Sequence, residues 1–267
     1  MQQNKPLILI KLGGSVITDK TKTLTPRMDI IKRLVGEIVK ARKELKDCLF
    51  LIGHGQGSFG HVPAAKYQTI NGFINEESRY GMAVVYNTAL QFNRIVVDEF
   101  IKQGLPAVSW LATQNILTSL GKKQKYFLKT LEMYLRNGLM PVTTGDVFVD
   151  EKQGCTIWSC EEIFTFLTKK LPFPIREIVY VTETNGVYGL DKKVIPQITP
   201  DTWPKIKKAV GTSIGFDVTG GMKLKMEESL KLAKKGINVK IMSGLQEDNL
   251  YDALIDKKWA GTLVTLP

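Results

Sequence analysis

The sequence predicts an α/β protein with a mostly parallel central sheet and helices on both of its faces. Short apolar runs that are typical of buried strands alternate with longer stretches in which apolar residues recur at helical spacing. Glycine-rich turns directly follow two of these apolar runs, at Gly13-Gly14 and from Gly53 onward. Strand–helix alternation favours parallel pairing, and ligands of such sheets bind beyond the carboxyl ends of the strands.

We expect the strands of one continuous sheet at seven apolar segments. In chain order they are Leu7–Leu12, 48–52, 106–110, Met140–Thr144, 177–182, 239–242 and 262–265. A hairpin is expected between 147–149 and 155–158, because Asp150 and Gly154 bound a turn between them.

Helices are expected between these strands. The segment 26–45 repeats apolar residues such as Ile31 and Leu34 at the spacing of an amphipathic helix, and Ser159 with Glu162 has the spacing of a capping box. The other expected elements are a helix over 76–103 that is broken or bent, a helix over 125–137, one from Ser159 to 171, a turn at Asn185-Gly186, and a helix from Gly220-Gly221 to 235.

The chain is expected to form a single domain over 1–267, with two functional halves that divide near 145–150. No Pro/Ser-rich linker, internal repeat or low-complexity tract interrupts the sequence. The lysine-rich segment 192–210 is the least regular and is predicted to be a mobile flap.

Composition excludes several classes of protein. The 267 residues are 43% hydrophobic and 24% charged, which suffices for a sizeable core. No apolar stretch approaches the ~20 residues of a membrane span, and no signal-peptide pattern opens the chain. The three cysteines form no C-x-x-C motif, which favours reduced thiols in a cytoplasm over a disulfide framework or zinc site.

The net charge of +11 raises the question of nucleic-acid binding. The lysines occur as scattered pairs, such as Lys122-Lys123 and Lys169-Lys170, which are typical of solvated helix faces and ends. No basic stripe interleaved with aromatic residues and no nucleic-acid-binding module is evident in the sequence. We therefore expect no nucleic acid and no membrane as partners, and we attribute local positive charge to anionic small molecules.

Two glycine-rich turns predict phosphate binding. Lys11-Leu-Gly-Gly-Ser15 and Gly53-His-Gly-Gln-Gly-Ser-Phe-Gly-His61 both follow predicted strands. Glycine lets the backbone approach a ligand closely, and N–H groups at the start of a helix favour anions. A protein that binds phosphate at both turns is the first hypothesis.

Two common nucleotide-binding motifs do not fit. The segment 55–60 matches G-x-G-x-x-G, but it follows the second strand instead of the first, and no acidic residue ends the next strand about twenty residues on. The sequence contains no Walker A motif. Any nucleotide is therefore bound by another scheme, and an NAD-dependent oxidoreductase is disfavoured.

Several polar residues near these turns have both a catalytic and a structural interpretation. Lys11 ends an apolar strand, where it needs an anionic partner unless it reaches solvent. Lys20 stands in a polar loop and, taken alone, is typical of a surface. His61 is able to hydrogen-bond phosphate in either charge state, whereas His54 is expected to pack in the core. Asp146 follows a strand and is either a catalytic carboxylate or a turn residue.

Together these segments resemble the amino acid kinase family, in particular its branch that phosphorylates isopentenyl phosphate. The matching motifs are Ile10-Lys-Leu-Gly-Gly-Ser-Val-Ile-Thr-Asp-Lys20, Gly53-His-Gly-Gln-Gly-Ser-Phe-Gly-His-Val-Pro-Ala-Ala-Lys-Tyr67, Gly145-Asp146, and Asp217-Val-Thr-Gly-Gly-Met222 with Lys225. They run in family order along the whole chain, and S-F-G-H after a glycine turn separates this branch from acetylglutamate and uridylate kinases. The resemblance implies an open αβα sandwich, with the phosphate acceptor on the half formed by about 1–150 and ATP on the half formed by about 151–267.

The resemblance also implies an activity and its residues. The γ-phosphoryl group of ATP would pass to the terminal phosphate of isopentenyl phosphate, with Mg²⁺ carried by ATP, no metal ligands from protein side chains, and a homodimer. Lys11 and Lys225 would bind the transferring and ATP phosphates, Lys20 would stabilise the transition state, and His61 would hold the acceptor phosphate. The implied ATP-binding residues are Lys11, Gly13, Gly14, Ser15, Gly57, Thr182, Glu183, Gly186, Tyr188, Gly220, Gly221 and Lys225. The implied substrate-binding residues are Gly14, Gln56, Gly60, His61, Gly145, Asp146 and Cys160.

Three departures from the family pattern bear on specificity. Thr182-Glu-Thr-Asn-Gly186 stands where the family has T-D-x-D-G, Ser159-Cys-Glu-Glu162 replaces S-G-D-D, and Gln56 replaces a glycine. A fosfomycin kinase-like phosphonate kinase and a non-catalytic nucleotide-binding relative therefore stay open as alternatives. An isoprenoid acceptor requires an apolar tunnel, whose candidate residues are Tyr80, Met82, Ala83, Val84, Tyr86 and Ile157.

Overall fold

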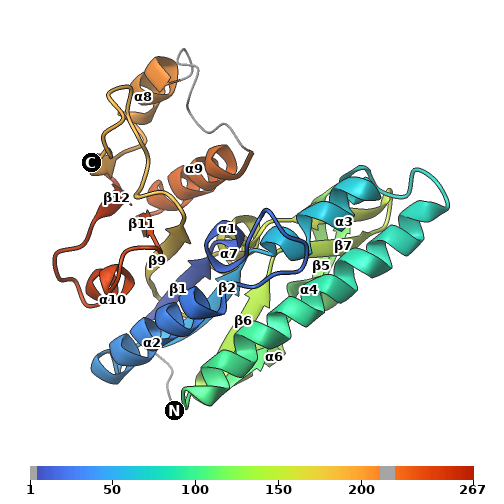
Figure 1. Ribbon diagram of the computed structural model, residues 1–267, viewed down its shortest axis with the longest axis horizontal. Coiled ribbons are helices and arrows are strands. Elements are labelled where there is room, and N and C mark those ends of the chain that lie inside the picture. Colours follow the sequence, from blue (N-terminus) through green and yellow to red (C-terminus); the bar gives the residue numbers. More distant parts are fainter. Residues whose placement is uncertain (1–4, 211–219) are drawn as a thin grey trace.

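The computed structural model describes residues 5–210 and 220–267, and Figure 1 shows the arrangement of their helices and strands. In this part of the chain the main sheet has eight strands. From edge to edge they are β10 (Gln197–Ile198), β12 (Gly261–Val264), β11 (Asn238–Ser243), β9 (Ile175–Thr182), β1 (Leu7–Leu12), β2 (Leu49–His54), β6 (Met140–Thr144) and β3 (Ala107–Ser109). Neighbouring strands are parallel except for β11 and β12, which confirms the mostly parallel sheet.

All seven expected strands lie in this sheet, and the chain also forms a second, smaller sheet that was not expected. Its strands, in spatial order, are β5 (Lys122–Tyr126), β4 (Ile116–Ser119), β7 (Asp146–Asp150) and β8 (Gly154–Trp158). The β7–β8 pair confirms the predicted hairpin. The β4–β5 hairpin was not predicted, because every residue of β5 is exposed and its sequence has no apolar alternation.

Helices cover both faces of the main sheet, as Figure 1 shows. One face carries α2 (Met28–Glu44), α4 (Glu77–Lys102) and α10 (Asn249–Leu254), and the other carries α6 (Lys129–Arg136), α7 (Cys160–Leu167) and α9 (Gly220–Ala233). Shorter helices are α1 (Gly14–Ile17), α3 (His61–Lys66), α5 (Ala112–Asn115), α8 (Trp203–Val210) and the 3₁₀ turns η1 (Gly57–Phe59) and η2 (Thr69–Asn71).

Three expectations about helices need correction. The helix α4 runs unbroken for 26 residues and contains no proline, and its Gly81 lies against the side chain of Tyr67. The helix expected over 125–137 begins only at Lys129, since the preceding residues form β5. The segment 192–210 contains β10 and α8, so it is more regular than expected, and its mobility stays a prediction.

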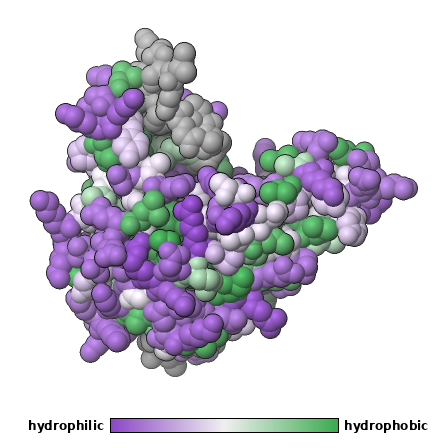
Figure 2. Space-filling view, in the orientation of Figure 1, coloured by the Kyte–Doolittle hydropathy of each residue, from purple (hydrophilic) through white to green (hydrophobic). Residues whose placement is uncertain are grey.

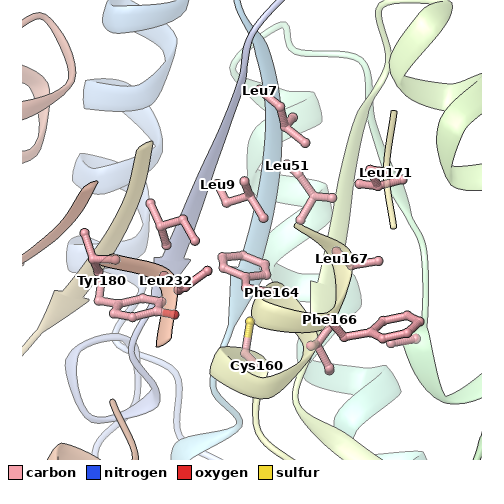
Figure 3. Packing of buried hydrophobic residues seen from close by; sticks show 14 of the residues in the cluster. Leu7, Leu9, Leu51, Cys160, Phe164, Phe166, Leu167, Leu171, Tyr180 and Leu232 are labelled. Carbon is pink, nitrogen blue, oxygen red and sulfur yellow. The ribbon is translucent and has the colours of Figure 1, made fainter. Parts of the chain in front are cut away.

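The core lies on both sides of the main sheet because the side chains of each strand alternate. Leu7 and Leu9 of β1 face α7 and α9, whereas Ile8 and Ile10 face α2 and α4. Figure 3 shows Leu9 and Leu51 packed towards Phe164 of α7. The molecular face drawn in Figure 2 is mostly hydrophilic, with smaller hydrophobic areas between polar side chains. In the described part of the chain no helix is long and apolar enough to pass through a bilayer.

Candidate active site

The backbones of the two glycine-rich turns contact each other at the carboxyl ends of β1 and β2. The N–H group of Gly55 donates to the carbonyl of Leu12 at 2.9 Å. A Cβ atom added to Gly14 would lie only 2.3 Å from the nitrogen of Gly57. Gly57 itself has a φ of +50°, and a Cβ atom there would lie 2.0 Å from Oγ1 of Thr18. Only glycine permits this approach, so the fold brings the backbone of both predicted phosphate-binding turns to one place.

A buried ion triad joins Lys11, Glu161 and Lys225 beside these turns. Lys11 lies on β1, Glu161 in the first turn of α7 and Lys225 on α9. One carboxylate oxygen of Glu161 pairs with Nζ of Lys11, and the other accepts a hydrogen bond from Nζ of Lys225 at 2.9 Å. Each lysine side chain is 11% exposed and that of Glu161 is 3% exposed. The structure therefore confirms that Lys11 has an anionic partner, and it brings Lys11 and Lys225 together.

The capping box predicted for α7 fixes where Glu161 points. The Ser159 hydroxyl accepts from the N–H of Glu162 at 3.2 Å, and the Glu162 carboxylate accepts from the N–H of Ser159 at 2.8 Å. Because Glu162 is bound at the start of the helix, its neighbour Glu161 projects from a fixed first turn towards the lysines.

The electrostatics of the triad favour the charged forms. Burial opposes ionisation of Glu161, but the charges of Lys11 and Lys225 outweigh it and hold the pKa of Glu161 at about 2. Burial and the nearby charge of Lys11 lower the pKa of Lys225, while Glu161 opposes that change. Two cations share one countercharge, so the cluster keeps a net positive charge for an anionic ligand.

Lys20 and His61 lie near each other beside the glycine turns. His61 begins α3, directly after Gly60, and both His61 and Lys20 are exposed. Partial loss of water and the charges of Lys20 and Lys11 lower the pKa of His61. These lysines are therefore near enough for their fields to reach the imidazole, and the neutral ring that results is suited to donating one hydrogen bond.

Gln56 bridges the second glycine turn and the predicted Gly145-Asp146 turn. Its Nε2 atom donates to the carbonyl of Gly145 at 2.6 Å and to Oδ1 of Asp146 at 3.3 Å. Its Oε1 atom lies across Gly60, where a Cβ atom would be only 1.8 Å away. Four predicted substrate-binding residues are thus adjacent to one another: Gln56, Gly60, Gly145 and Asp146.

Asp146 is buried in a way that keeps it protonated at neutral pH. Its Oδ1 atom accepts from the N–H of Val147 at 2.8 Å, and among the described residues Oδ2 has no hydrogen-bond partner. Burial raises the pKa of Asp146 to about 8, although the hydrogen bonds from Val147 and Gln56 oppose the change. A protonated carboxyl is a hydrogen-bond donor, not a general base, so the structure favours a positioning role.

Cys160 occupies a packing position at the start of α7. Its side chain is 1% exposed, and its Sγ atom fills the space beside Gly53, where a Cβ atom would be 2.2 Å away. Burial raises the pKa of the thiol. Figure 3 shows it next to Phe164 in the hydrophobic cluster. Contact between Cys160 and a substrate stays a prediction.

The predicted nucleotide-binding residues follow β9, which is the neighbour of β1. The hydroxyl of Thr182 donates to the carbonyl of Thr184 at 2.8 Å and so shapes the turn after the strand. Gly186 has a φ of +141°, and a Cβ atom there would lie 2.7 Å from Oγ1 of Thr262. Tyr188 is half-buried and pairs with Val194. The turn is therefore built on backbone geometry that glycine permits.

The remaining predicted nucleotide-binding residues lie directly after β1, in α1 and at the start of α9. The N–H of Gly13 donates to Val181 at 2.8 Å, which links the first turn to β9. Ser15 lies in α1, and α9 begins at Gly220-Gly221 as expected, so its N-terminal backbone stands near Lys225. Residues 217–219 of the predicted motif lie outside the described residues.

Two further residues belong to the site although sequence reasoning did not select them. Glu161 appeared only as part of the Ser159–Glu162 motif, and the need of Lys11 for a buried anion was the signal that could have found it. Arg27 lies 3.5 Å from the carbonyl of Ser15 and 3.9 Å from the carboxylate of Glu183. Arg27 therefore adds a cation between the first glycine turn and Glu183.

The donor set suits phosphate better than a bare metal ion. Within residues 5–210 and 220–267 there is no group of three or more His, Cys, Asp or Glu side chains that could hold a metal. The carboxylate at the centre of the site, Glu161, is already engaged by two lysines. Lysines and backbone N–H groups fit phosphate oxygens, so the residues fit a Mg²⁺ ion that is held by nucleotide phosphates.

Comparison with known proteins agrees with this geometry. Residues 6–243 match the family model described as "Amino acid kinase family". The chain is 31% identical over 257 residues to isopentenyl phosphate kinase of Methanocaldococcus jannaschii, covering 93% of this chain and 95% of that protein. It is also 31% identical over 270 residues to isopentenyl phosphate kinase of Methanothermobacter thermautotrophicus, covering 97% and 99%.

Solved structures show the same fold. An X-ray structure of isopentenyl phosphate kinase superposes with a TM-score of 0.81 at 29% identity, covering 97% of this chain and all of that one. A substrate complex of isopentenyl phosphate kinase superposes with a TM-score of 0.76 at 22% identity. The αβα arrangement, the paired glycine turns and the family match over most of the chain lead to one conclusion: this chain belongs to the amino acid kinase family.

Proposed function

We propose that this protein is a kinase that transfers the γ-phosphoryl group of ATP to the terminal phosphate of isopentenyl phosphate, giving isopentenyl diphosphate. The observation that carries the proposal is the Lys11–Glu161–Lys225 triad beside two contacting glycine turns. The 31% identity to isopentenyl phosphate kinases supports this choice of acceptor.

The triad fits the demands of phosphoryl transfer. Such a transfer needs alignment of the reacting groups and neutralisation of spreading negative charge. Glu161 holds Lys11 and Lys225 at a fixed separation, so both cations are in place before a phosphate arrives. Mg²⁺ bound to the ATP phosphates would supply further positive charge. Lys11 and Lys225 contact the transferring group, while backbone N–H groups of the turns bind its oxygens.

The acceptor side needs no strong base. A phosphate acceptor is already an anionic nucleophile, so the lowered pKa of His61 is compatible with its role. His61 donates a hydrogen bond to that phosphate and thereby orients it. Lys20 stabilises the transition state from the same side.

An apolar surface near His61 supports a hydrocarbon acceptor. Ala64 follows His61 by nearly one helical turn on α3 and therefore lies on the same side of that helix. Ala64 packs with the half-buried side chains of Met82, Tyr86 and Ile157 around a small buried cluster. These three residues were among the candidates for an apolar tunnel, whereas Tyr80 is 65% exposed. A chain attached to a phosphate at His61 has apolar side chains within reach.

The direct test is ATP consumption by purified protein with Mg²⁺, using isopentenyl phosphate, dimethylallyl phosphate and fosfomycin as acceptors. Turnover confined to the isoprenoid phosphates would support the proposal. Turnover of fosfomycin alone would keep the phosphoryl-transfer mechanism and replace the acceptor. ATP binding without turnover of any of the three would contradict the proposed reaction and favour a nucleotide-binding relative.

A further inference from the structure

Lysines from distant parts of the sequence gather on one surface of the molecule. The Nζ atoms of Lys123 on β5 and of Lys170 after α7 lie 5.4 and 5.6 Å from the centroid of the Tyr126 ring. Burial, together with the charges of Lys235, Lys231 and Lys170, lowers the pKa of Lys169. The basic surface, as we call it, consists of the exposed residues Lys123, Lys169, Lys170 and Lys235, and Lys122 and Lys125 flank Lys123 on the exposed strand β5.

One acidic side chain reduces this charge only locally. Glu228 of α9 is buried, pairs with Lys231 at 2.5 Å and raises the pKa of Lys169 against the effect of the lysines. We therefore leave Lys231 out of the basic surface. Its four members, and the lysines that flank Lys123, keep exposed ammonium groups on the strand β5 and just past the ends of α7 and α9.

The β4–β5 hairpin presents a leucine at its tip beside these lysines. Leu120 and Gly121 form the two-residue turn, with φ angles of +50° and +70°. Asn-Gly suits such a turn, whereas a bulky side chain in the left-handed region is strained. Leu120 is also 67% exposed and Phe127, at the other end of β5, is 60% exposed. The positive φ of Leu120 opposes folding and its exposed side chain gains nothing from burial, which indicates that leucine at this position serves something other than folding.

The tip is held in place by buried groups. The carboxylate of Asp150 accepts hydrogen bonds from the N–H of Leu120 at 3.0 Å and of Gly121 at 2.9 Å. The indole of Trp158 donates to the carbonyl of Gly121 at 2.8 Å. These contacts fix the hairpin relative to the second sheet, so its exposed side chains are presented in one arrangement.

Contrary to the expectation from the sequence that no membrane is a partner, we propose that the basic surface and the hairpin tip dock this protein peripherally on a bilayer that contains anionic phospholipids. Leu120 and Phe127 enter the interfacial region of the lipid, and the lysines face the negatively charged headgroups. Exposed apolar side chains beside clustered lysines are the combination that binds such membranes. Neither the insertion of apolar side chains nor the attraction of lysines to anionic headgroups holds a protein firmly by itself.

The same surface fits nucleic acid less well. Bases bind to proteins by stacking on aromatic rings. The ring of Tyr126 is already approached by Lys123 and Lys170, and it packs edge-on against Phe166 at 5.3 Å. A leucine at the hairpin tip offers no ring for a base to stack on, and the exposed ring of Phe127 stands alone at the other end of β5. The lipid surface therefore accounts for both the charge and the exposed leucine.

The test is sedimentation of the full chain with vesicles of phosphatidylcholine, with or without about one third phosphatidylglycerol. We expect binding to the anionic vesicles that 0.5 M NaCl abolishes. The Leu120→Asn variant keeps a favourable turn and should bind at least threefold more weakly. The Lys122→Glu/Lys123→Glu variant should bind more than tenfold more weakly, at about fivefold for each lysine charge removed. Lys257→Glu/Lys258→Glu, an equal charge change at two other exposed lysines, should bind as the unchanged protein does.

Three results would overturn the proposal. One is no sedimentation with anionic vesicles at low salt. Another is an equal loss of vesicle binding in the Lys257→Glu/Lys258→Glu variant, which would show that binding depends on net charge and not on this surface. The third is binding to a single-stranded RNA oligonucleotide, lost in the Lys122→Glu/Lys123→Glu variant, without binding to vesicles. Kinase activity on water-soluble acceptors does not enter this test, so its outcome is independent of the proposed reaction.

Discussion

Lys225 and Glu161 meet inside the molecule although 64 positions separate them in the sequence. Nζ of Lys225 donates to Oε1 of Glu161 at 2.9 Å, from one helix to the next. The second oxygen of the same carboxylate forms an ion pair with Lys11 of the central strand β1. One buried anion thus sets the positions of two cations that the proposed reaction uses.

Removing the charge of Glu161 should disable the enzyme. In Glu161→Gln the two lysines lose their shared countercharge, so they repel each other and move from their fixed positions. We expect kcat to fall by about 10²–10³, the cost of losing a preorganised electrostatic contact, and stability to fall by about 3–5 kcal/mol. The measurement is steady-state turnover together with urea unfolding. Glu162→Gln is the matched control because glutamine still completes the capping box, and an equal loss of turnover there would contradict the assignment.

The same residue predicts how stability depends on acid. The pKa of Glu161 is about 2 in the folded protein against an ordinary value of 4.5, so its folded pKa is depressed. Its contribution is therefore fully present above about pH 4.5 and is lost as the pH falls towards 2, by roughly 3 kcal/mol in all. Unfolding measured at pH 6, 4 and 3 should show the difference between wild type and Glu161→Gln shrinking as pH falls. A constant difference would show that the carboxylate charge does not matter.

Replacing Lys20 should separate catalysis from nucleotide binding. Lys20 is exposed in the loop that follows α1, and it is not a member of the buried triad. We expect Lys20→Ala to lower kcat by about 10²-fold or more while the affinity for ATP stays within about threefold. Lys22→Ala, an exposed lysine of the same loop, is the control for general charge. If ATP affinity collapses in Lys20→Ala, its role at the transition state is wrong.

His61 should matter for the acceptor and not for ATP. Loss of its hydrogen bond to a phosphate should weaken acceptor use by roughly 1–3 kcal/mol in kcat/KM. Since the pKa of His61 is lowered, the ring is neutral at pH 7, and this effect should not change between pH 7 and 8. The measurement is the initial rate of His61→Ala at varied acceptor concentration and saturating ATP. If kcat and the KM for the acceptor are unchanged, His61 is not part of the site.

Asp146 should make the protein less stable as pH rises. Its folded pKa of about 8 exceeds the ordinary value of 3.8, so the folded state holds the proton more tightly and stability falls as pH rises from about 4 to about 8. Asp146→Asn cannot ionise, and its amide oxygen still accepts from Val147 and Gln56. We expect the melting temperature of the variant, measured relative to that of the wild type, to rise by several degrees between pH 5 and pH 8. Asp98→Asn, at an exposed position of α4, should show no such trend; the same trend in both variants would rule out burial as the cause.

The sequence predicted the central sheet well because each buried strand carries an apolar run. The segments around Leu9 and Ile52 were found in this way, and both form parallel strands of the main sheet. The strand Lys122–Tyr126 was not found, because all its side chains are exposed and its pairing with β4 leaves no apolar pattern. The break expected in α4 was wrong because the helix contains no proline, and its single glycine, Gly81, lies within a continuous helix against Tyr67.

For the site, the sequence determined which groups are present: glycine turns after strands, a lysine at the end of an apolar strand, and the order of motifs typical of the family. Those features are local, since a turn needs its glycines and a buried strand needs its apolar residues wherever they pack. Tertiary structure alone decided that Glu161 joins Lys11 to Lys225, that Gln56 reaches Asp146, and that Lys123 and Lys170 approach the same tyrosine ring. These contacts join residues far apart in the chain, and only the packing of helices on the sheet brings their charges close enough to interact.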